Sequence, residues 1–416
     1  MWKTIFDRMM LKLIKKGQLT VTFPDGETKT YGSTTDPSCE VRLTDEQALR
    51  ALCLKPELAL GESYMDGTLQ IAGDDPEALL RVLLRNARNM DIPIWARFYN
   101  KLRYAVQAWA KLNTPKHARQ NVAHHYDISD DLYRLFLDED MQYSCAYFTD
   151  PDMSLEDAQV AKKAHIAAKL QIEPGMKVLD IGCGWGGMAI TLARDYGADV
   201  TGVTLSENQL ATARRRAEAA GVAGRTDFRL QDYRALNQTF DRIVSVGMLE
   251  HVGVPFYGVY FNQISHLLNE TGVALIHTIG SLDPAGPQAE WITKYIFPGG
   301  YIPSLSQLAP AIERSGLWSL DIEILRLHYA MTLRHWLARF DEKIDIVRQS
   351  YDDRFIRMWR FYLIACFMTF EEEKQVVFQL QLGHQRAAVP LTRDYMYQPT
   401  GIPLQAQADP TSQAAE

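Results

Sequence analysis

The sequence predicts an α/β protein whose larger part is a doubly wound, mostly parallel sheet of seven strands, preceded by a smaller α+β domain. Two observations support this prediction. From Ile172 onward, short apolar segments alternate with helical ones, an order typical of a parallel sheet with helices on both faces. The segment VLDIGCGWGG, from Val178 to Gly187, has the form of a buried strand, a glycine-rich turn and the start of a helix.

Length and composition are those of an ordinary globular chain. The 416 residues carry a net charge of −7 and have the length of roughly two to three domains. The five cysteines are odd in number and lack a C-x-x-C spacing, so we expect reduced thiols, no disulfide framework and no metal site. No segment approaches the length of a membrane span, and residues 1–16 lack the apolar centre of a signal peptide. We therefore expect a soluble, cytoplasmic protein.

The amino-terminal part is expected to mix helices and strands. Residues 1–16 place apolar side chains at helical spacing, and residues 17–32 alternate in polarity around a Pro-Asp-Gly turn, which predicts a β-hairpin. Helices are expected near residues 45–54 and 76–86, separated by a glycine-punctuated, loop-rich segment at 58–74. Thr114-Pro115 and the polar residues that follow predict a boundary between domains of residues 1–114 and 115–397. The polar residues 398–416 predict a disordered tail.

The second domain contains the expected strands of the sheet, each a short segment that interrupts the helical pattern. They are expected at Lys177–Ile181, Asp199–Thr204, Thr226–Leu230, Arg242–Gly247, Gly272–Thr278, Ser319–Leu327 and Val376–Leu382. The helix after the second strand has a recognisable start, because Ser206 and Gln209 form the S-x-x-Q pattern of a capping box.

Polar residues follow several strand ends, where ligands collect in open α/β sheets. The glycine turn predicts a pocket for a nucleoside-bearing cofactor, and it lacks the third glycine spacing of a dinucleotide site. We favour S-adenosylmethionine. After the third strand, Asp232 can accept a hydrogen bond from an adenine amine and Tyr233 can pack on its ring. The alternatives are a tight turn without a ligand and a solvated aspartate.

Two further strand ends carry groups suited to chemistry. Glu250 follows the fourth strand and His277 lies at the end of the fifth, so neighbouring strand ends would bring a carboxylate and an imidazole together. The structural alternative is a glutamate that caps the next helix and a histidine satisfied in the core. Cys145 could act as a nucleophile, although a small buried residue is the simpler interpretation.

A basic stretch precedes the second domain. Nine Lys and Arg residues lie between Arg81 and Arg119, against the single acid Asp91. Aromatic residues alternate with several of these cations, which predicts an interfacial helix that docks on an anionic membrane surface. These cations are Arg97, Lys101, Arg103 and Lys111, and the aromatic residues are Trp95, Phe98, Tyr99, Tyr104 and Trp109. The alternative is a domain or subunit contact. We expect no nucleic acid partner, because no nucleic-acid-binding motif accompanies the charge.

Eight motifs, taken in order, resemble the cyclopropane-fatty-acyl-phospholipid synthases and the related mycolic acid cyclopropane synthases. They are HHYDISDDLYRLFL, YSCAYF, LDIGCGWGG, GVTLSENQ, DRIVSVGMLEHVG, LIHTIG, YIFPGG and LRLHYAMTLRHW. The similarity extends from about His117 to Gln385, and GESYMDG resembles the extra amino-terminal domain of the bacterial phospholipid enzymes. The resemblance implies the class I methyltransferase fold, a homodimer, and a peripheral position at the inner face of the membrane.

The resemblance also implies an activity. The methyl group of S-adenosylmethionine is transferred to a cis double bond of a phospholipid acyl chain, and a bound bicarbonate deprotonates the resulting carbocation so that a cyclopropane ring closes. The implied bicarbonate-site residues are Cys145, Glu250, His277, Ile279 and Tyr329. The implied cofactor contacts are Tyr143, Ser144, Gly182, Gly184, Thr204, Leu205, Ser206, Gln209, Asp232 and Tyr233.

Other functions share part of this pattern. A relative that methylates the acyl chain without closing a ring, or a small-molecule methyltransferase, cannot be separated from a cyclopropane synthase by sequence. A lipid-binding protein with a vestigial cofactor pocket is the non-enzymatic alternative. The intact glycines, Glu250, His277 and Tyr329 argue against this last alternative.

Overall fold

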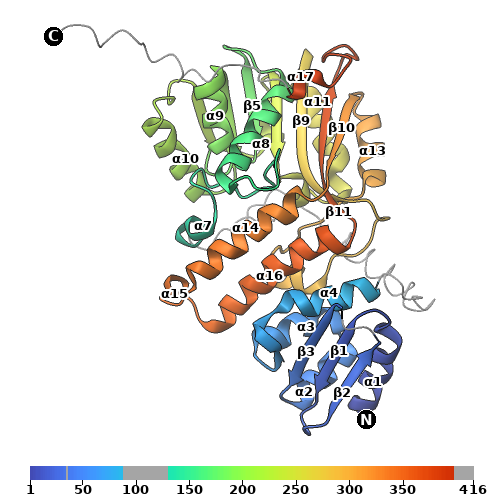
Figure 1. Cartoon of the computed structure of the whole chain (residues 1–416). Coiled ribbons are helices and arrows are strands. Elements are labelled where there is room, and N and C mark those ends of the chain that lie inside the picture. Colours follow the sequence, from blue (N-terminus) through green and yellow to red (C-terminus); the bar gives the residue numbers. More distant parts are fainter. Residues whose placement is uncertain (34–35, 88–129, 398–416) are drawn as a thin grey trace, which may run out of the picture.

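The computed structural model describes residues 1–33, 36–87 and 130–397 (Figure 1). A large sheet with its helices lies at one end of the molecule, and a small amino-terminal sheet lies at the other. A long helical pair, α14 (His328–Glu342) and α16 (Asp353–Glu372), occupies the middle. The predicted domain boundary at 114/115, the basic residues from Arg88 to Arg119 and the predicted tail at 398–416 lie outside the described residues.

The large sheet contains the seven predicted strands in the order β10-β11-β9-β8-β5-β6-β7. The neighbours from β9 to β7 are parallel, whereas β11 is antiparallel to both β9 and β10, which confirms the mostly parallel sheet. The first three strands match the prediction to the residue, and the others differ at their ends. The bounds are β5 Lys177–Ile181, β6 Asp199–Thr204, β7 Thr226–Leu230, β8 Phe240–Val246, β9 Leu268–Ser281, β10 Trp318–Leu325 and β11 Gln375–Gly383.

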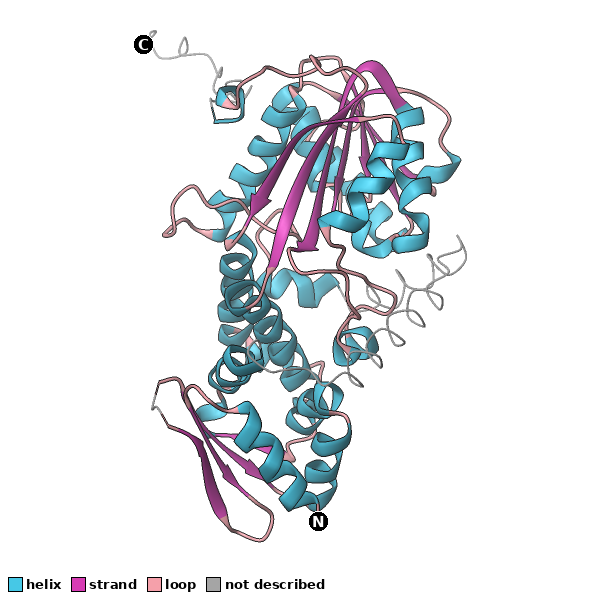
Figure 2. Ribbon diagram, turned by 90° about the vertical axis from the view of Figure 1, so that its right-hand side faces the viewer, coloured by secondary structure: helices cyan, strands magenta, loops and turns pink. Residues whose placement is uncertain are grey.

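Helices cover both faces of this sheet, as predicted (Figure 2). The alternation of side chains along β5 shows the two faces: Val178 packs with α8 and α9, whereas Leu179 packs with α11 and α13. The helices on the first face are α8 Leu155–Leu170, α9 Gly187–Tyr196 and α10 Glu207–Ala219, and those on the second are α11 Tyr257–Leu267 and α13 Leu305–Arg314. The remaining short helices are α7 Asp130–Phe136, α12 Glu290–Tyr295, α15 Ile344–Val347 and α17 Asp394–Tyr397. Within the described ranges, every helix is too short or too polar to cross a membrane.

The amino-terminal domain folds around a second sheet in the order β2-β1-β3-β4. The predicted hairpin is confirmed, because β1 and β2 pair antiparallel across the Pro-Asp-Gly turn. The prediction that residues 58–74 are rich in loops is wrong, since most of them form α3 and β4. The bounds are α1 Trp2–Leu13, β1 Gln18–Thr22, β2 Thr28–Gly32, β3 Ser38–Leu43, α2 Glu46–Leu54, α3 Pro56–Met65, β4 Leu69–Ile71 and α4 Pro76–Ala87.

Gly61 explains why the sequence of α3 resembles a loop. It lies inside the helix, where a side chain would overlap the indole ring of Trp291 from α12. The glycine therefore serves close packing between two parts of the chain and does not mark a turn.

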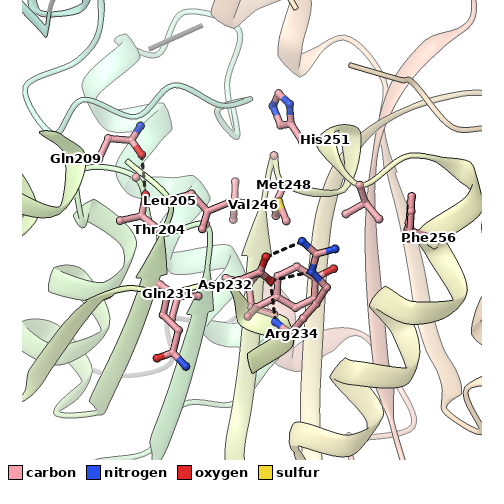
Figure 3. A pocket seen from close by; sticks show the side chains of 17 residues that line it. Thr204, Leu205, Gln209, Gln231, Asp232, Arg234, Val246, Met248, His251 and Phe256 are labelled. Carbon is pink, nitrogen blue, oxygen red and sulfur yellow. Dashed lines mark hydrogen bonds and ion pairs between the residues drawn. The ribbon is translucent and has the colours of Figure 1, made fainter. Parts of the chain in front are cut away.

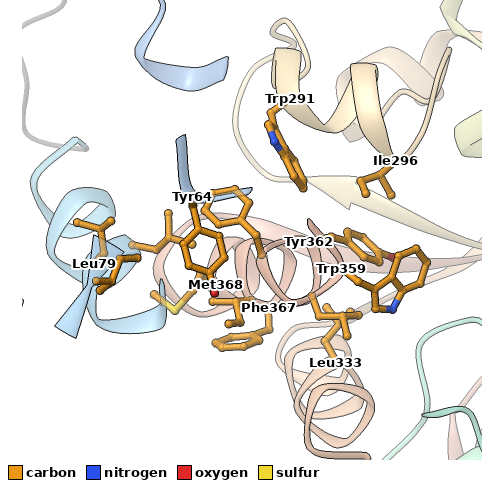
Figure 4. Close-up of a cluster of buried hydrophobic side chains, with 14 of the residues drawn as sticks. Tyr64, Leu79, Trp291, Ile296, Leu333, Trp359, Tyr362, Phe367 and Met368 are labelled. Carbon is orange, nitrogen blue, oxygen red and sulfur yellow. The ribbon is translucent and has the colours of Figure 1, made fainter. Parts of the chain in front are cut away.

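The amino-terminal domain and the helical pair share one hydrophobic core (Figure 4). Tyr64 from α3 and Leu79 from α4 lie beside Phe367 and Met368 of α16. The ring centroids of Tyr64 and Phe361 are 5.8 Å apart. Because this core is continuous, the amino-terminal domain is packed firmly against α14 and α16, which lie between it and the large sheet.

Ion pairs surround this core. Arg81 and Arg85 of α4 both bind Glu372 of α16, with N–O distances of 2.7 and 3.0 Å. Arg334 of α14 joins the cluster through Glu77 and Glu371, at 2.9 and 2.6 Å. The first two cations of the basic stretch, Arg81 and Arg85, are therefore part of a contact with α16. The four cations that are predicted to bind a membrane lie outside the described residues.

We predict that Gly61→Ala destabilises the protein. Alanine is favoured over glycine within a helix by up to about 1 kcal/mol, but an overpacked core costs about 1–3 kcal/mol. Trp291 is 2% exposed and has no room to move. Urea unfolding should therefore show a net loss of stability. Gly258→Ala in α11 is the matched control, because the added methyl group meets no atom within 4 Å. An equal loss of stability in both variants would contradict the close packing of Gly61 against Trp291.

Candidate active site

The glycine turn after β5 lines a pocket at the carboxyl end of the parallel strands. Figure 3 shows side chains that line the same pocket. Gly182 and Gly184 have φ angles of 81° and 54°, a region that side chains disfavour. A Cβ atom at Gly184 would meet no atom within 4 Å and would project into open space. The turn thus leaves the backbone exposed to a ligand, as the sequence predicts.

The pocket brings together most of the predicted cofactor residues. Seven of the ten line it, namely Gly182, Gly184, Thr204, Leu205, Gln209, Asp232 and Tyr233. Ser206 does not line the pocket. Its hydroxyl accepts a hydrogen bond of 3.3 Å from the main-chain amide of Gln209 and thereby caps α10. The Gln209 side chain does not complete the predicted capping box; its oxygen accepts from the Thr204 hydroxyl at 3.0 Å.

Arg234 is a pocket residue that the sequence analysis missed. Its guanidinium donates to both oxygens of Asp232, at 2.9 and 2.6 Å, and its main-chain amide donates to the same carboxylate at 3.0 Å (Figure 3). Asp232 is therefore held in one orientation and is not the solvated aspartate of the alternative interpretation. An adenine amine that binds Asp232 would share this carboxylate with Arg234.

The other missed lining residues come from the same strand ends. Met248, His251, Val252 and Phe256 follow β8, and Gln231 follows β7. Burial lowers the pKa of His251 to about 4, so its imidazole is neutral near pH 7. The rule that ligands collect at strand ends predicts this edge of the sheet, but it does not say which side chains turn toward the pocket, so these residues could not be named.

Tyr143 and Ser144 lie outside the lining that the described residues form. The Tyr143 hydroxyl is 2.7 Å from that of Tyr362, and its ring stacks on Trp336 with centroids 5.2 Å apart. The Ser144 hydroxyl accepts a hydrogen bond of 2.9 Å from Lys162, a fully buried side chain of α8. No motif or spacing indicated Lys162, whose burial lowers its pKa to about 8.

Glu250 occupies a short helical turn (Leu249–His251) after β8. One carboxylate oxygen, Oε1, accepts a hydrogen bond of 2.6 Å from the main-chain amide of Ile279. The other, Oε2, is buried and has no hydrogen-bond partner among the described residues. Burial raises the pKa of Glu250 from 4.5 to about 7. The two neighbouring strand ends therefore meet at this carboxylate, with Ile279 as the residue that orients it.

His277 lies on β9, where it pairs in register with Val246 of β8. Its side chain is 2% exposed, and its Nδ1 atom is 3.1 Å from Nε2 of Gln379. Burial, with the charges of Lys162 and Lys169, lowers the pKa of His277 to about 3. The imidazole is therefore neutral throughout the physiological range.

The remaining predicted residues belong to the core that adjoins this end of β9. Cys145 is fully buried, and burial raises the pKa of its thiol, so it is a small core residue and not a nucleophile. Tyr329 lies in the first turn of α14, and its ring centroid is 5.9 Å from that of Trp336 and 5.1 Å from that of Phe370. Ile279 packs against the same cluster.

The raised pKa of Glu250 predicts a pH-dependent stability. The native state holds this proton more tightly than the unfolded state, so stability falls as pH rises from about 4.5 to about 7. A glutamine cannot titrate. We expect the stability of Glu250→Gln, relative to the wild type, to rise by about 1–3 kcal/mol between about pH 5 and about pH 8. Urea unfolding at both pH values checks this, and the same relative stability at both would contradict it.

Comparison with known proteins identifies relatives of both parts of the chain. The family model described as mycolic acid cyclopropane synthetase matches residues 113–380, and a model described as a domain of unknown function matches residues 5–91. Cyclopropane-fatty-acyl-phospholipid synthase from Escherichia coli is 41% identical over 79% of this chain and 83% of its own. A probable fatty acid methyltransferase from Pseudomonas putida is 34% identical over 87% of this chain and 92% of its own.

A solved structure shows the same fold with a ligand. The mycolic acid cyclopropane synthase complexed with SAH and CTAB is 34% identical and superposes with a TM-score of 0.60, covering 64% of this chain and 97% of its own. The fold and the pocket at the glycine turn define an enzyme of the S-adenosylmethionine-dependent methyltransferase class, with the predicted class I fold. Within that class, the chain belongs to the mycolic acid cyclopropane synthetase family.

Proposed function

We propose that this protein is a cyclopropane-fatty-acyl-phospholipid synthase, which adds a methylene group from S-adenosylmethionine across a cis double bond of an unsaturated phospholipid acyl chain. The observation that carries the proposal is the pairing of β8 with β9, which brings the neighbouring strand ends that carry Glu250 and His277 together next to the cofactor pocket. The name of the Escherichia coli relative supports the substrate class.

The chemistry of an alkene explains this pairing. An alkene has no proton to lose before it attacks a methyl group, so a base that activates an amine or a hydroxyl would serve no purpose. The acceptor carbon becomes cationic, and the site must then hold a base for the added methyl group. When bound, S-adenosylmethionine would supply the methyl group and bicarbonate would supply that base.

The residues present fit a small protonated oxyanion. The buried Oε2 of Glu250 lacks a partner and can accept a hydrogen bond from a hydroxyl group. The neutral His277 can donate a hydrogen bond without placing a full positive charge beside a carbocation. The other residues of the proposed site are Cys145, Ile279 and Tyr329, which pack in one hydrophobic cluster.

Aromatic rings support the cationic step. Tyr143, Tyr329 and Trp336 form one cluster, with ring centroids 5.2 and 5.9 Å from Trp336. The face of an aromatic ring attracts a cation, most strongly in a site without water. In our proposal this cluster stabilises positive charge on the acyl chain while Glu250 and His277 hold the base.

Lipid analysis tests the proposal. Purified protein, S-adenosylmethionine and vesicles of an unsaturated phospholipid should yield acyl chains heavier by one CH2 group. Proton NMR of the product then identifies the ring, because cyclopropane protons resonate at unusually high field. A branched product of the same mass, or no product, would contradict the proposal. Bicarbonate dependence, docking on anionic membranes at the cytoplasmic face and a homodimer stay predictions.

A further inference from the structure

A chain of four polar side chains, three of them buried, extends from the edge of the large sheet to His277. Glu323 of β10 accepts a hydrogen bond from Nζ of Lys169 at the end of α8. The same Nζ donates to Oε1 of Gln379 on β11 at 2.7 Å, and Nε2 of Gln379 lies 3.1 Å from Nδ1 of His277. Lys169 and Gln379 are both 0% exposed. Three strands and one helix thus contribute one residue each to a polar connection that ends at the proposed site.

The chemistry of these groups fixes the direction of each hydrogen bond. An ammonium group has only donors, so the atom of Gln379 that faces Lys169 must be its oxygen. The amide nitrogen of Gln379 then donates to Nδ1 of His277. A ring nitrogen that accepts a hydrogen bond carries no proton, and the proton of a neutral imidazole therefore resides on Nε2.

We propose that Gln379, itself oriented by Lys169, is a positioning residue that holds His277 as the neutral Nε2–H tautomer. This inference rests on the proposed function, which places His277 at the anion site. In that site Nε2–H is the group that donates, and the opposite tautomer would present a lone pair to an anion.

Glu323 balances the positive charge of this chain. His165 also binds Glu323, with Nε2 and Oε2 2.7 Å apart. Burial alone would raise the pKa of Glu323, but the hydrogen bond from His165 and the charge of Lys169 lower it to about 2. The charged or titratable groups around His277 are Lys162, His165 and Lys169 from α8 and Glu323 from β10. An ionised Glu323 lets Lys169 remain a donor to Gln379 although it is buried.

The substitution Gln379→Glu tests the inference with almost no change of shape. A carboxylate has no proton to donate at neutral pH, so it would accept from Nδ1 of His277 and reverse the tautomer or charge the ring. We expect turnover with S-adenosylmethionine and unsaturated phospholipid vesicles to fall about tenfold to a hundredfold. The affinity for S-adenosylmethionine, measured by calorimetry, should stay unchanged, because Gln379 lies outside the pocket lining.

Gln381→Glu is the matched control. Gln381 lies two residues along the same strand, is equally buried, and donates to the carbonyl of Lys169 and to Tyr395 at 2.6 and 2.9 Å. The control places the same buried charge on the same face of β11 without a hydrogen bond to His277. It should lose stability but keep most of the wild-type turnover and the wild-type tautomer.

Nitrogen-15 NMR of histidine-labelled protein reads the tautomer directly, with the His277 signals assigned by their loss in His277→Asn. An unprotonated Nδ1 in the wild type that becomes protonated in Gln379→Glu supports the inference. A protonated Nδ1 in the wild type, or the same tautomer in both proteins, overturns it. Equal losses of turnover in Gln379→Glu and Gln381→Glu would also overturn it. If the wild type forms no product, the proposed function fails, and the NMR comparison still decides the tautomer.

Discussion

Glu250→Gln is expected to lower turnover by about a hundredfold or more and to leave the affinity for S-adenosylmethionine unchanged. General acid–base and electrostatic contributions of a single group are each of this size. Glutamine keeps the shape and can still accept the hydrogen bond from the Ile279 amide, but the charge at Oε2 is lost. Steady-state kinetics with phospholipid vesicles and calorimetry with the cofactor measure the two effects separately.

The control is the same substitution at a distant glutamate. Glu313 is exposed on α13 and lies outside the pocket lining, so Glu313→Gln should retain wild-type kinetics. Added bicarbonate should not restore Glu250→Gln, because the variant lacks the acceptor for its hydroxyl group. A variant with near wild-type turnover, with or without bicarbonate, would remove Glu250 from the proposed site.

Gly184→Val should weaken the binding of S-adenosylmethionine by about tenfold or more. The φ angle of 54° is strained for a β-branched residue, and the new side chain would project into the pocket. A branched side chain at this point occupies the space in which a ligand would lie against the main chain. Calorimetric titration of the folded variant measures this loss.

Gly221→Val separates backbone strain from blockage of the pocket. Gly221 has a φ angle of 70°, and a Cβ atom there would also meet no atom within 4 Å. It lies after α10, outside the pocket lining. This control should lose stability to a similar degree and keep its cofactor affinity. Equal affinities in the two variants would place the cofactor away from Gly184.

The sequence was sufficient to predict the large sheet and the floor of its pocket. Strands β5, β6 and β7 are regular runs between well-marked helices, so their bounds could be predicted to the residue. Parallel order also implies that Glu250 and His277 lie near one another, because strand ends meet at one edge. The other residues of the candidate site could be named only from the motifs that resemble the family.

Features that depend on distant packing could not be predicted. Gly61 looks like a turn signal until Trp291 is placed beside it. Arg81 and Arg85 belong to a basic stretch of the sequence, and their partner Glu372 is almost three hundred residues away in the chain. The chain of residues behind His277 joins side chains that are more than a hundred residues apart in the sequence. A local sequence pattern cannot predict such contacts.

The shared core of α3, α4 and α16 has a consequence for the part of this chain that matches shorter relatives. The match to the solved mycolic acid cyclopropane synthase covers 97% of that protein but only 64% of this chain. A relative named as a synthase is therefore a shorter protein. Here, removal of residues 1–87 would uncover Trp291 and Phe361 and leave Glu371 and Glu372 without Arg81. The two parts therefore stabilise one another, and each constrains which substitutions the other can accept.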